Sequence, residues 1–524
     1  MTRDWQFDRD AIETFHFRRC SLDANRGEAE LVYGFDDGPD LIERLTFPRA
    51  PFELDPVRAD ATERALRLLH LVAGVSYYKA AVPPRIAIDS YTIDADTAGL
   101  LTLIYEYGLG EFAYRNGLDL RGRIEFPATP TDGAAVHTSP HRGEGTVQTE
   151  REALRTHFDS PPSPPGRGVG GEGPTGAGNR TLQRLGKIAP SPQPLSRRER
   201  GSKRDPLHLS EHTHALVAIG GGKDSLVTIE TLRAAGIAQT VTWIGGSQLI
   251  AACAARTGLP TLNIGRALAP ELFEYNRQGA WNGHIPVTAI NSSILVLAAL
   301  LSGADQVVFS NERSASYGSQ IPGTGEVNHQ WSKGWIFERA FGEHIERHVA
   351  QNLHYYSLLR PLSELAVARL FAREDRYDAW FSSCNRNFHL LGERPTQRWC
   401  SVCPKCHFVF LALAPFMPKA RLVRIFGRNL LDDAALAPAF DALLEFGAHK
   451  PFECVGEGRE SRAAFAAIAN RAEWREDAMV VRFTREIAPR LPAGDLELAP
   501  LLGAGEEHRI PPDVWARIHA HLDI

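Results

Sequence analysis

The stretch Leu216-Val217-Ala218-Ile219-Gly220-Gly221-Gly222-Lys223-Asp224-Ser225 decides the fold of this chain. An apolar run ends in three glycines, and residues 226–232 then show the apolar spacing of a helix. This order predicts a strand, a tight turn and a helix start. Glycines let the backbone approach an anion closely, and the free N–H groups at a helix start point toward it. The stretch therefore predicts a phosphate site, and the expected ligand is a nucleotide.

The polar side chains of this turn also suit phosphate. Lys223 supplies a positive charge, Ser225 a hydroxyl donor, and Asp224 a cap for the helix. A Walker A loop has Ser or Thr directly after Gly-Lys, whereas Asp224 intervenes here. A glycine-rich turn without a ligand is the alternative interpretation.

The order Gly-Gly-x-Asp-Ser over residues 221–225 resembles the PP-loop of the ATP pyrophosphatases. The resemblance implies cleavage of ATP between its α and β phosphates and activation of a substrate as its adenylate. Gly220 stands where that family has Ser. A neighbouring backbone N–H would have to replace the missing donor.

Length and composition limit the function classes. A chain of 524 residues with 43% apolar residues predicts two or three domains with sizeable cores. Its 58 basic and 63 acidic side chains leave a net charge of −5, which gives no overall signal for nucleic-acid binding. The first residues are charged rather than apolar, and the longest apolar runs, 294–301 and 408–417, are too short to span a bilayer. We expect a cytoplasmic protein with no membrane or nucleic-acid partner.

The pattern along the chain divides it into four parts. Residues 1–137 combine strand and helix patterns and predict an α+β domain, and residues 408–524 predict a helical C-terminal region. Residues 138–208 are rich in Pro, Gly and Arg and predict a disordered insertion, because they cannot bury enough apolar surface to offset the ordering entropy. Basic residues of this insertion could contact nucleic acid, but a solvated linker is the expected role.

Residues 209–407 alternate between strand and helix patterns. This alternation predicts an α/β fold with a parallel doubly wound sheet of the PP-loop ATP pyrophosphatase (adenine nucleotide α-hydrolase-like) type. In such sheets, ligands bind beyond the carboxyl ends of the strands, where the glycine turn lies. The predicted strands are 217–219, 240–244, 262–264 and 307–310, and the predicted helices are 225–235, 249–256 and 287–302.

The long polar loop after strand 307–310 is a second candidate site. Glu312 and Arg313 could bind Mg²⁺ or phosphate, and His329 and Lys333 could move protons. A hydrogen-bonded surface loop is the alternative. His284 precedes a helix, and it is either a ligand contact or a structural histidine.

Four of the seven cysteines form a group of zinc-ligand spacing. Cys384, Cys400, Cys403 and Cys406 predict a tetrahedral Cys₄ zinc site, with His407 able to replace one thiolate. The group resembles the structural zinc site of the PP-loop enzymes of deazaguanine synthesis. An iron–sulfur cluster and free buried thiols are the alternatives. Two cysteines acting as the acid and base of a racemase are disfavoured, because one short loop cannot serve both faces of a substrate.

Several segments together extend the resemblance beyond the PP-loop. In order, they resemble the UDP-N-acetyl-α-D-muramoyl-L-alanyl-L-glutamate epimerase family (MurL) over nearly the whole chain apart from 138–205. The resemblance implies an isomerase that inverts the terminal L-Glu of UDP-MurNAc-L-Ala-L-Glu to D-Glu in peptidoglycan precursor synthesis, and hence in cell wall biogenesis. It also implies a need for ATP and Mg²⁺ and release of AMP and pyrophosphate. The segments are 17–22, 33–35, 220–225, 311–314, 327–332, 399–407 and 411–416.

The resemblance leads to a hypothesis for each site residue. Glu312 and Arg313 would hold magnesium and pyrophosphate, and Asp224 would order the turn or bind Mg²⁺ through water. His329 and Lys333 are the candidates for proton transfer, and the N-terminal domain is the expected contact for the UDP-sugar. The ATP phosphates would be bound by Gly220, Gly221, Gly222, Lys223 and Ser225, with Lys223 also acting in catalysis.

Two rival functions remain open at the level of sequence. One is a PP-loop enzyme that adenylates an RNA base or a small acid for nitrogen or sulfur transfer. Overall acidity weighs against an RNA substrate. The other is a nucleotide sensor that has kept the fold without catalysis, an idea that Gly220 in place of Ser leaves open.

Overall fold

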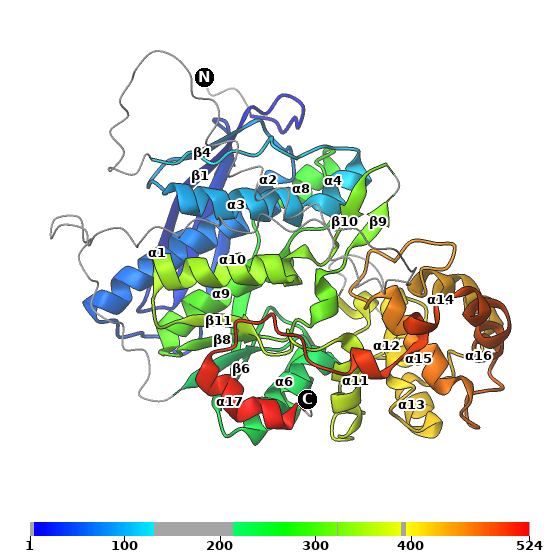
Figure 1. Cartoon of the computed structure of the whole chain (residues 1–524). Helices are drawn as coiled ribbons and strands as arrows, with labels where there is room; N and C mark the ends of the chain where they lie inside the picture. Colours follow the sequence, from blue (N-terminus) through cyan, green and yellow to red (C-terminus); the bar gives the residue numbers. More distant parts are fainter. Residues whose placement is uncertain (1–4, 130–212, 322, 389–394, 523–524) are drawn as a thin grey trace, which may run out of the picture. The chain divides into compact units, whose positions relative to one another are not determined.

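A nine-stranded sheet runs through the described part of the computed structural model, which comprises residues 5–129, 213–321, 323–388 and 395–522 (Figure 1). The predicted insertion at 138–208 lies entirely outside these residues. The strands, in spatial order, are β11 (His354–Ser357), β8 (Gln306–Phe309), β5 (His214–Ala218), β6 (Ala238–Ile244), β7 (Thr261–Ala267), β3 (Leu41–Thr46), β2 (Glu28–Phe35), β1 (Thr14–Asp23) and β4 (Arg85–Ile88).

The five strands from β11 to β7 are parallel and are covered on both faces. Neighbouring residues of one strand enter opposite cores, as Leu216 and Val217 of β5 do. In Figure 1, α9 (Val287–Ser302) and α10 (Trp335–His344) lie on one side of these strands, and α6 (Lys223–Ala234) lies on the other. The mixed α/β class with a large, mostly parallel sheet is thereby confirmed. Strand β11 has no counterpart in the sequence-based prediction.

The strand order contains a reversal that positions the site. From β5 the chain steps outward through β6 and β7, and it then returns to place β8 and β11 on the other side of β5. The loops that leave the carboxyl ends of β5 and β8 therefore diverge to opposite faces. This divergence opens a crevice at the switch point, where α/β sheets bind their ligands. The glycine turn follows β5, and the polar loop follows β8.

The N-terminal strands extend the same sheet. Strand β3 pairs antiparallel with β7, with Thr46 opposite Gly265. A buried ion pair crosses this junction, from Arg266 Nε to Glu43 Oε1 at 2.7 Å. The expected mixture of strands and helices before residue 130 is confirmed, with α1 (Pro56–Ala73), α3 (Ala95–Gly108) and α4 (Gly110–Asn116) following or flanking the strands. The pairing of β3 with β7 was not foreseen.

The C-terminal region is helical, as predicted. Between residues 408 and 522 the described chain contains helices and no strand. The predicted boundary between 407 and 408 falls within the first helix of this region. No described helix combines the length and apolar character needed to cross a membrane. In Figure 1 most of this region lies beside α11 (Glu364–Ala372), with α12 (Pro404–Leu413), α13 (Lys419–Phe426), α14 (Ala437–Leu443), α15 (Gly458–Ala469) and α16 (Ala478–Arg482). The last helix, α17 (Pro512–Ile518), lies beside α6.

Candidate functional site

The glycine turn joins β5 to α6 as the sequence predicts, and α6 begins at Lys223. Gly221 has φ +79°, a left-handed conformation that favours glycine. A Cβ atom on Gly222 would lie 2.7 Å from the Ser383 hydroxyl, whereas one on Gly220 would meet nothing within 4 Å. The backbone conformation therefore favours glycine at 221, and the Ser383 hydroxyl leaves no room for a side chain at 222, while position 220 faces open space.

Buried charges surround the start of α6. The fully buried Lys223 ammonium donates hydrogen bonds to the carboxylates of Asp224 and Glu364. Lys405 Nζ donates to the other oxygen of Glu364 at 3.2 Å. Glu312 is also buried, and after burial itself the largest influences on its pKa are these four charged groups. We call Lys223, Asp224, Glu312, Glu364 and Lys405 the charge cluster.

The pKa values of the two glutamates of the charge cluster shift in opposite directions. For Glu312, burial and then the nearby carboxylates of Glu364 and Asp224 raise the pKa. For Glu364, burial alone would raise the pKa, but the ammonium groups of Lys223 and Lys405 lower it. Glu312 is thus the carboxyl of this cluster that gains most from an additional cation, since a cation would favour its ionised form.

Three adjacent strands deliver the charge cluster to one edge of the sheet. Lys223 and Asp224 follow β5, Glu312 follows β8, and Glu364 opens the helix that follows β11. Arg360 fixes the backbone of the β8 loop, because its guanidinium donates to the Glu312 carbonyl at 2.7 Å. The carboxyl ends of parallel strands meet at one edge, so residues distant in sequence converge there.

A second group of titratable side chains contains a cysteine. Lys333 Nζ lies 3.1 Å from Cys454 Sγ. His329 Nδ1 hydrogen-bonds to Glu111 of α4, and the His284 ring lies 4.1 Å from the His329 ring, centroid to centroid. We call Glu111, His284, His329, Lys333 and Cys454 the thiol cluster.

The charges of the thiol cluster follow from its internal contacts. Burial alone would raise the pKa of Cys454, but Lys333 and His329 lower it to about 5. Burial would lower the pKa of His329, but hydrogen bonding to Cys454 and Glu111 raises it to about 9. Burial and the adjacent His329 lower the pKa of His284 to about 3. At neutral pH the cluster therefore holds a thiolate beside an imidazolium, with His284 neutral.

The potential ligand atoms of Glu111, His284 and His329 lie within 4.8 Å of one another. Such a group could hold a metal ion only if both imidazoles were neutral, because a protonated ring nitrogen has no lone pair to donate. Because the pKa of His329 is raised to about 9, a bound cation would have to displace its ring proton. Without a cation, these three residues form a group of acid–base side chains in which His329 bonds to Glu111.

The charge cluster and the thiol cluster are neighbours. Glu312 and Asp224 raise the pKa of Lys333, and Lys405 helps to lower the pKa of Cys454. Such mutual effects require short distances in a protein interior. The charge cluster can bind phosphate and a divalent cation. The thiol cluster beside it can accept and donate protons.

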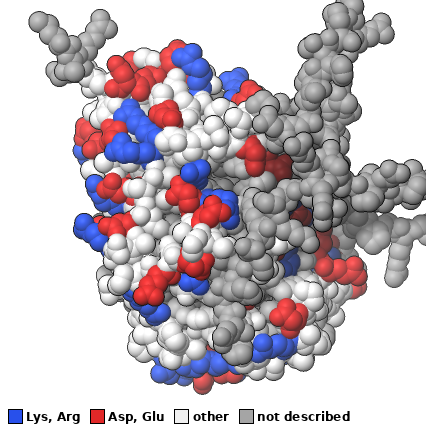
Figure 2. All heavy atoms as spheres, turned by 90° about the vertical axis from the view of Figure 1, so that its left-hand side faces the viewer, with Lys and Arg blue, Asp and Glu red and all other residues white. Residues whose placement is uncertain are grey.

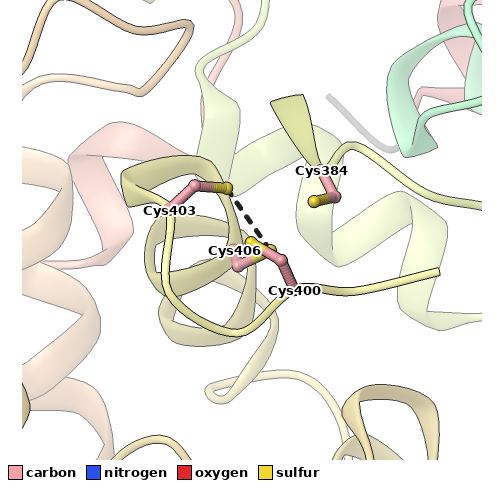
Figure 3. A group of neighbouring side chains, drawn as sticks. All are labelled: Cys384, Cys400, Cys403 and Cys406. Atoms are coloured by element: carbon pink, nitrogen blue, oxygen red, sulfur yellow. Dashed lines mark hydrogen bonds between the residues drawn. The ribbon is translucent and has the colours of Figure 1, made fainter. Parts of the chain in front are cut away.

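The four predicted zinc ligands converge (Figure 3). Cys384 faces the other three from a separate segment, and Cys406 Sγ lies 3.5 Å from Cys403 Sγ and 3.7 Å from Cys400 Sγ. Zinc–sulfur bonds of about 2.3 Å in a tetrahedron imply sulfur separations of about 3.8 Å. The cluster therefore fits zinc. His407 is turned to the Ser401 carbonyl at 3.3 Å and is not part of the four-ligand group, so its suggested role as a substitute ligand is wrong.

The remaining predicted residues lie around the same edge. Ser225 Oγ donates to the Gly222 carbonyl at 3.1 Å, inside the turn. The Arg313 guanidinium lies beside Gly505 and acts electrostatically on Glu457, so it faces the C-terminal region. The structure thus groups Lys223, Asp224 and Glu312. The Arg313 side chain points away from this group, toward Gly505 and Glu457.

Sequence reasoning missed four members of the two clusters. Lys405 lies between Cys403 and Cys406, so the cysteine motif is the sequence signal that points to it. Cys454 was one of three cysteines outside that motif, and Glu364 follows a capping serine, but neither pattern indicates chemistry. Glu111 lies 218 residues from its partner His329, and no local pattern could pair them.

Charged side chains on the face drawn in Figure 2 are mixed in sign. Basic and acidic residues are interspersed there, rather than gathered into a basic patch of the kind that binds a phosphate backbone. The absence of a nucleic-acid partner stays a prediction.

Together, the fold and the two clusters define a mixed α/β protein with a charged ligand site at the switch point of its sheet. Family models match most of the chain: the MurL N-terminal domain matches residues 6–151 and 180–358, and the MurL C-terminal domain matches residues 380–496. The chain therefore belongs to the MurL family.

Full-length relatives support this assignment. A UDP-N-acetyl-alpha-D-muramoyl-L-alanyl-L-glutamate epimerase from Xanthomonas oryzae pv. oryzae is 61% identical over 518 residues, which cover 99% of each chain. Proteins of the same name from a Micromonospora species and from Salinispora tropica are 39% and 38% identical. Their alignments cover 96% of both chains in the first case, and 91% of this chain and 89% of the relative in the second.

Proposed function

We propose that this chain is a UDP-N-acetyl-α-D-muramoyl-L-alanyl-L-glutamate epimerase, an isomerase that converts the terminal L-Glu of UDP-MurNAc-L-Ala-L-Glu to D-Glu in peptidoglycan precursor synthesis. Identity to named epimerases along the whole chain supports the proposal. The observation that carries it is the proximity of the charge cluster to the thiol cluster, since the Arg360 guanidinium donates to the backbone carbonyls of both Glu312 and Lys333. The carboxyl of an amino acid is one bond from its α-carbon, so activation and proton transfer need neighbouring sites.

The reaction explains why ATP is needed. Removing the α-proton of an ionised carboxylate would place a second negative charge beside the first. Adenylation neutralises the carboxylate, so a general base of ordinary strength can reach the enolate. Protonation on the opposite face inverts the centre, and water then releases AMP. His329 and Lys333 remain our candidates for moving these protons.

The glycine turn suits the phosphates of ATP. The free N–H groups of α6 face the turn, and Gly221 and Gly222 leave room for close approach. The Ser383 hydroxyl lies against Gly222, buried and without a hydrogen-bond partner among the described residues. A buried hydroxyl without a partner is costly unless a ligand satisfies it. We propose that Ser383 supplies the donor that Gly220 lacks.

The oxygen donors at this edge suit Mg²⁺. Asp224 and Glu312 are carboxylates, the ligands that Mg²⁺ prefers, and burial together with the nearby carboxylates raises the pKa of Glu312. These two residues would hold the ion, which would neutralise phosphate charge. Lys223 is held by Asp224 and Glu364, so its contact with phosphate would require it to leave one of them.

Further parts of the proposal rest on the sequence. They are the PP-loop ATP pyrophosphatase type of the fold, the four-part division of the chain, contact of the N-terminal part with the UDP-sugar, the Arg313 contact with pyrophosphate, and a cytoplasmic location. We also propose that the four cysteines hold a structural zinc. Zinc there would fix the start of α12, and with it Lys405 of the charge cluster.

The proposed function is tested by incubating the protein with ATP, Mg²⁺ and UDP-MurNAc-L-Ala-L-Glu in D₂O. We expect AMP release and a D-glutamyl product that carries deuterium at the α-carbon. AMP without deuterium would favour nitrogen or sulfur transfer instead, and no AMP with any acid would contradict adenylation. Lys223→Ala should abolish turnover, whereas a nucleotide sensor would lose binding alone.

A further inference from the structure

We propose that the Arg115 guanidinium binds the γ-carboxylate of the terminal glutamyl residue, and that this contact selects a glutamyl substrate and directs its α-carboxylate toward ATP. The inference rests on the proposed function and assigns a carboxylate subsite beside the thiol cluster. Arg115 lies in the last turn of α4, with a side chain that is 55% exposed.

The substrate presents two similar carboxylates on one amino acid. Only adenylation of the α-carboxylate makes the α-proton removable, because two methylene groups separate the γ-carboxyl from the α-carbon. The γ-carboxylate stays ionised throughout the reaction, so a cation near the site of proton transfer can hold it. Such a cation also decides which carboxylate reaches the glycine turn. The site therefore needs a positive group whose hydrogen-bond donors are not already used.

The lysines of the two clusters already have anionic partners. Lys223 and Lys405 both donate to Glu364, and Lys333 Nζ lies 3.1 Å from Cys454 Sγ. Each of these ammonium groups would have to leave a partner in order to hold a substrate carboxylate. That exchange would leave a buried charge uncompensated, which is costly. A cation at the margin of the clusters, open to solvent, avoids this cost.

Arg115 is a cation of this kind. It follows Glu111 by one helical turn, and its Nε donates to Glu111 Oε1. The other oxygen of Glu111 bonds to His329, so one carboxylate connects Arg115 to the thiol cluster. The Arg115 guanidinium therefore lies two hydrogen bonds from His329, while its exposed side faces solvent from which a substrate can approach.

An aromatic ring helps to fix the guanidinium. Arg115 Cζ lies 5.2 Å from the centroid of the Phe452 ring, within the range of a cation–π contact. Phe452 is two residues before Cys454, and the Tyr114 ring packs on it with centroids 5.6 Å apart. The Nη1 and Nη2 groups of Arg115 have no hydrogen bond to the part of the chain that the structure describes. Two such parallel donors match the two oxygens of a carboxylate.

The test compares Arg115→Gln with the wild-type protein on UDP-MurNAc-L-Ala-L-Glu and on the corresponding L-Gln compound, with ATP and Mg²⁺ in D₂O. The variant should lower kcat/KM for the glutamyl substrate by about 10–100-fold, because a hydrogen bond between charged groups is lost. The loss should appear mainly in KM, since the γ-carboxylate has the same charge in the ground and transition states. For the glutaminyl substrate, kcat/KM should stay near the wild-type value.

Arg67→Gln is the matched control. Arg67 Nε donates to Glu63 Oε1 at 2.9 Å, one helical turn earlier in α1, and Arg67 Cζ lies 5.2 Å from the centroid of the Tyr91 ring. This arrangement repeats that of Arg115, but neither Glu63 nor Tyr91 belongs to a cluster. Arg67→Gln should therefore keep wild-type kcat/KM on both substrates. Arg115→Lys should recover part of the loss, since it restores the charge without the paired donors.

An equal loss on both substrates by Arg115→Gln would show that the residue acts only through Glu111 and His329, and it would overturn the inference. An unchanged preference for the glutamyl substrate in this variant would overturn it as well. Failure of the wild-type protein to release AMP and to introduce deuterium into the glutamyl substrate would instead overturn the proposed function.

Discussion

At the scale of the residue, neighbouring charges decide what a buried thiol can do. Cys20 and Cys454 are both buried enough for desolvation to be the largest influence on their pKa. For Cys20, burial and the nearby Glu63 raise the pKa to about 12. For Cys454, two cations outweigh burial. Cys20 is therefore a protonated structural thiol, whereas Cys454 is a thiolate.

This contrast predicts different alkylation by iodoacetamide. The thiolate is the reactive form, so Cys454 should react at a nearly constant rate from about pH 6 to about pH 8 and lose reactivity as the pH falls through about 5. Cys20 should react at least about ten-fold more slowly at neutral pH. Peptide mass spectrometry after timed quenching measures both rates in one sample.

The charged groups that act on Cys454 in this pH range are the cations Lys333, His329 and Lys405 and the carboxyl of Glu453, whose pKa burial and Cys403 raise to about 7. Lys333→Met removes the nearest charge and should move the loss of Cys454 reactivity to a higher pH. An unchanged profile in this variant, or a Cys454 that reacts like Cys20, would contradict the assigned thiolate.

At the scale of the element, the start of α12 joins the cysteine group to the charge cluster. Cys403 is the N-cap residue of α12, Lys405 lies in its first turn, and Cys406 follows directly. The Lys405 backbone N–H also donates to Glu453, which is next to Cys454, at 3.1 Å. One helix start therefore positions a zinc-ligand group, a cation of the charge cluster and the neighbour of Cys454.

We expect purified protein to contain about one zinc per chain by atomic emission, because four thiolates close a tetrahedral structural site. Cys400→Ser should lower the zinc content, the melting temperature and AMP release together, since α12 would lose its anchor. His407→Gln is the control and should keep its zinc, because His407 bonds to Ser401 instead. Wild-type stability in a zinc-free protein would refute the structural role.

At the scale of the whole molecule, the pairing of β3 with β7 makes one sheet from two distant parts of the sequence. The ion pair between Glu43 and Arg266 lies at this junction, with Glu43 fully buried. Burial alone would lower the pKa of Arg266, but Glu43 raises it. Removal of one partner would leave a buried, uncompensated charge.

Glu43→Gln should therefore reduce the free energy of unfolding by roughly 3–5 kcal/mol. The double variant Glu43→Met/Arg266→Met should recover most of this loss, because apolar side chains of similar size replace both charges. Urea unfolding followed by circular dichroism gives the three free energies. Equal destabilisation in the single and double variants would show that packing, rather than charge, matters at this junction.

Local patterns account for the parts of this protein that were predicted correctly. Apolar runs and glycines indicated β5, the turn and α6, and the helical spacing of 287–302 matched α9 in full. The cysteine spacing located a group that converges in space. Each of these features depends on residues close together in the chain, or on a motif that chemistry restricts tightly.

The amino-acid sequence by itself determined the strand, turn and helix around Gly221, the α/β class and the four cysteines, because backbone conformation and metal-ligand spacing are set by near neighbours. Only the tertiary structure decided that Glu364 joins Lys223, that Glu111 joins His329, and that Cys454 is a thiolate. The order of strands brings such residues together, and their charge states then follow from burial and from neighbours that are distant in the chain.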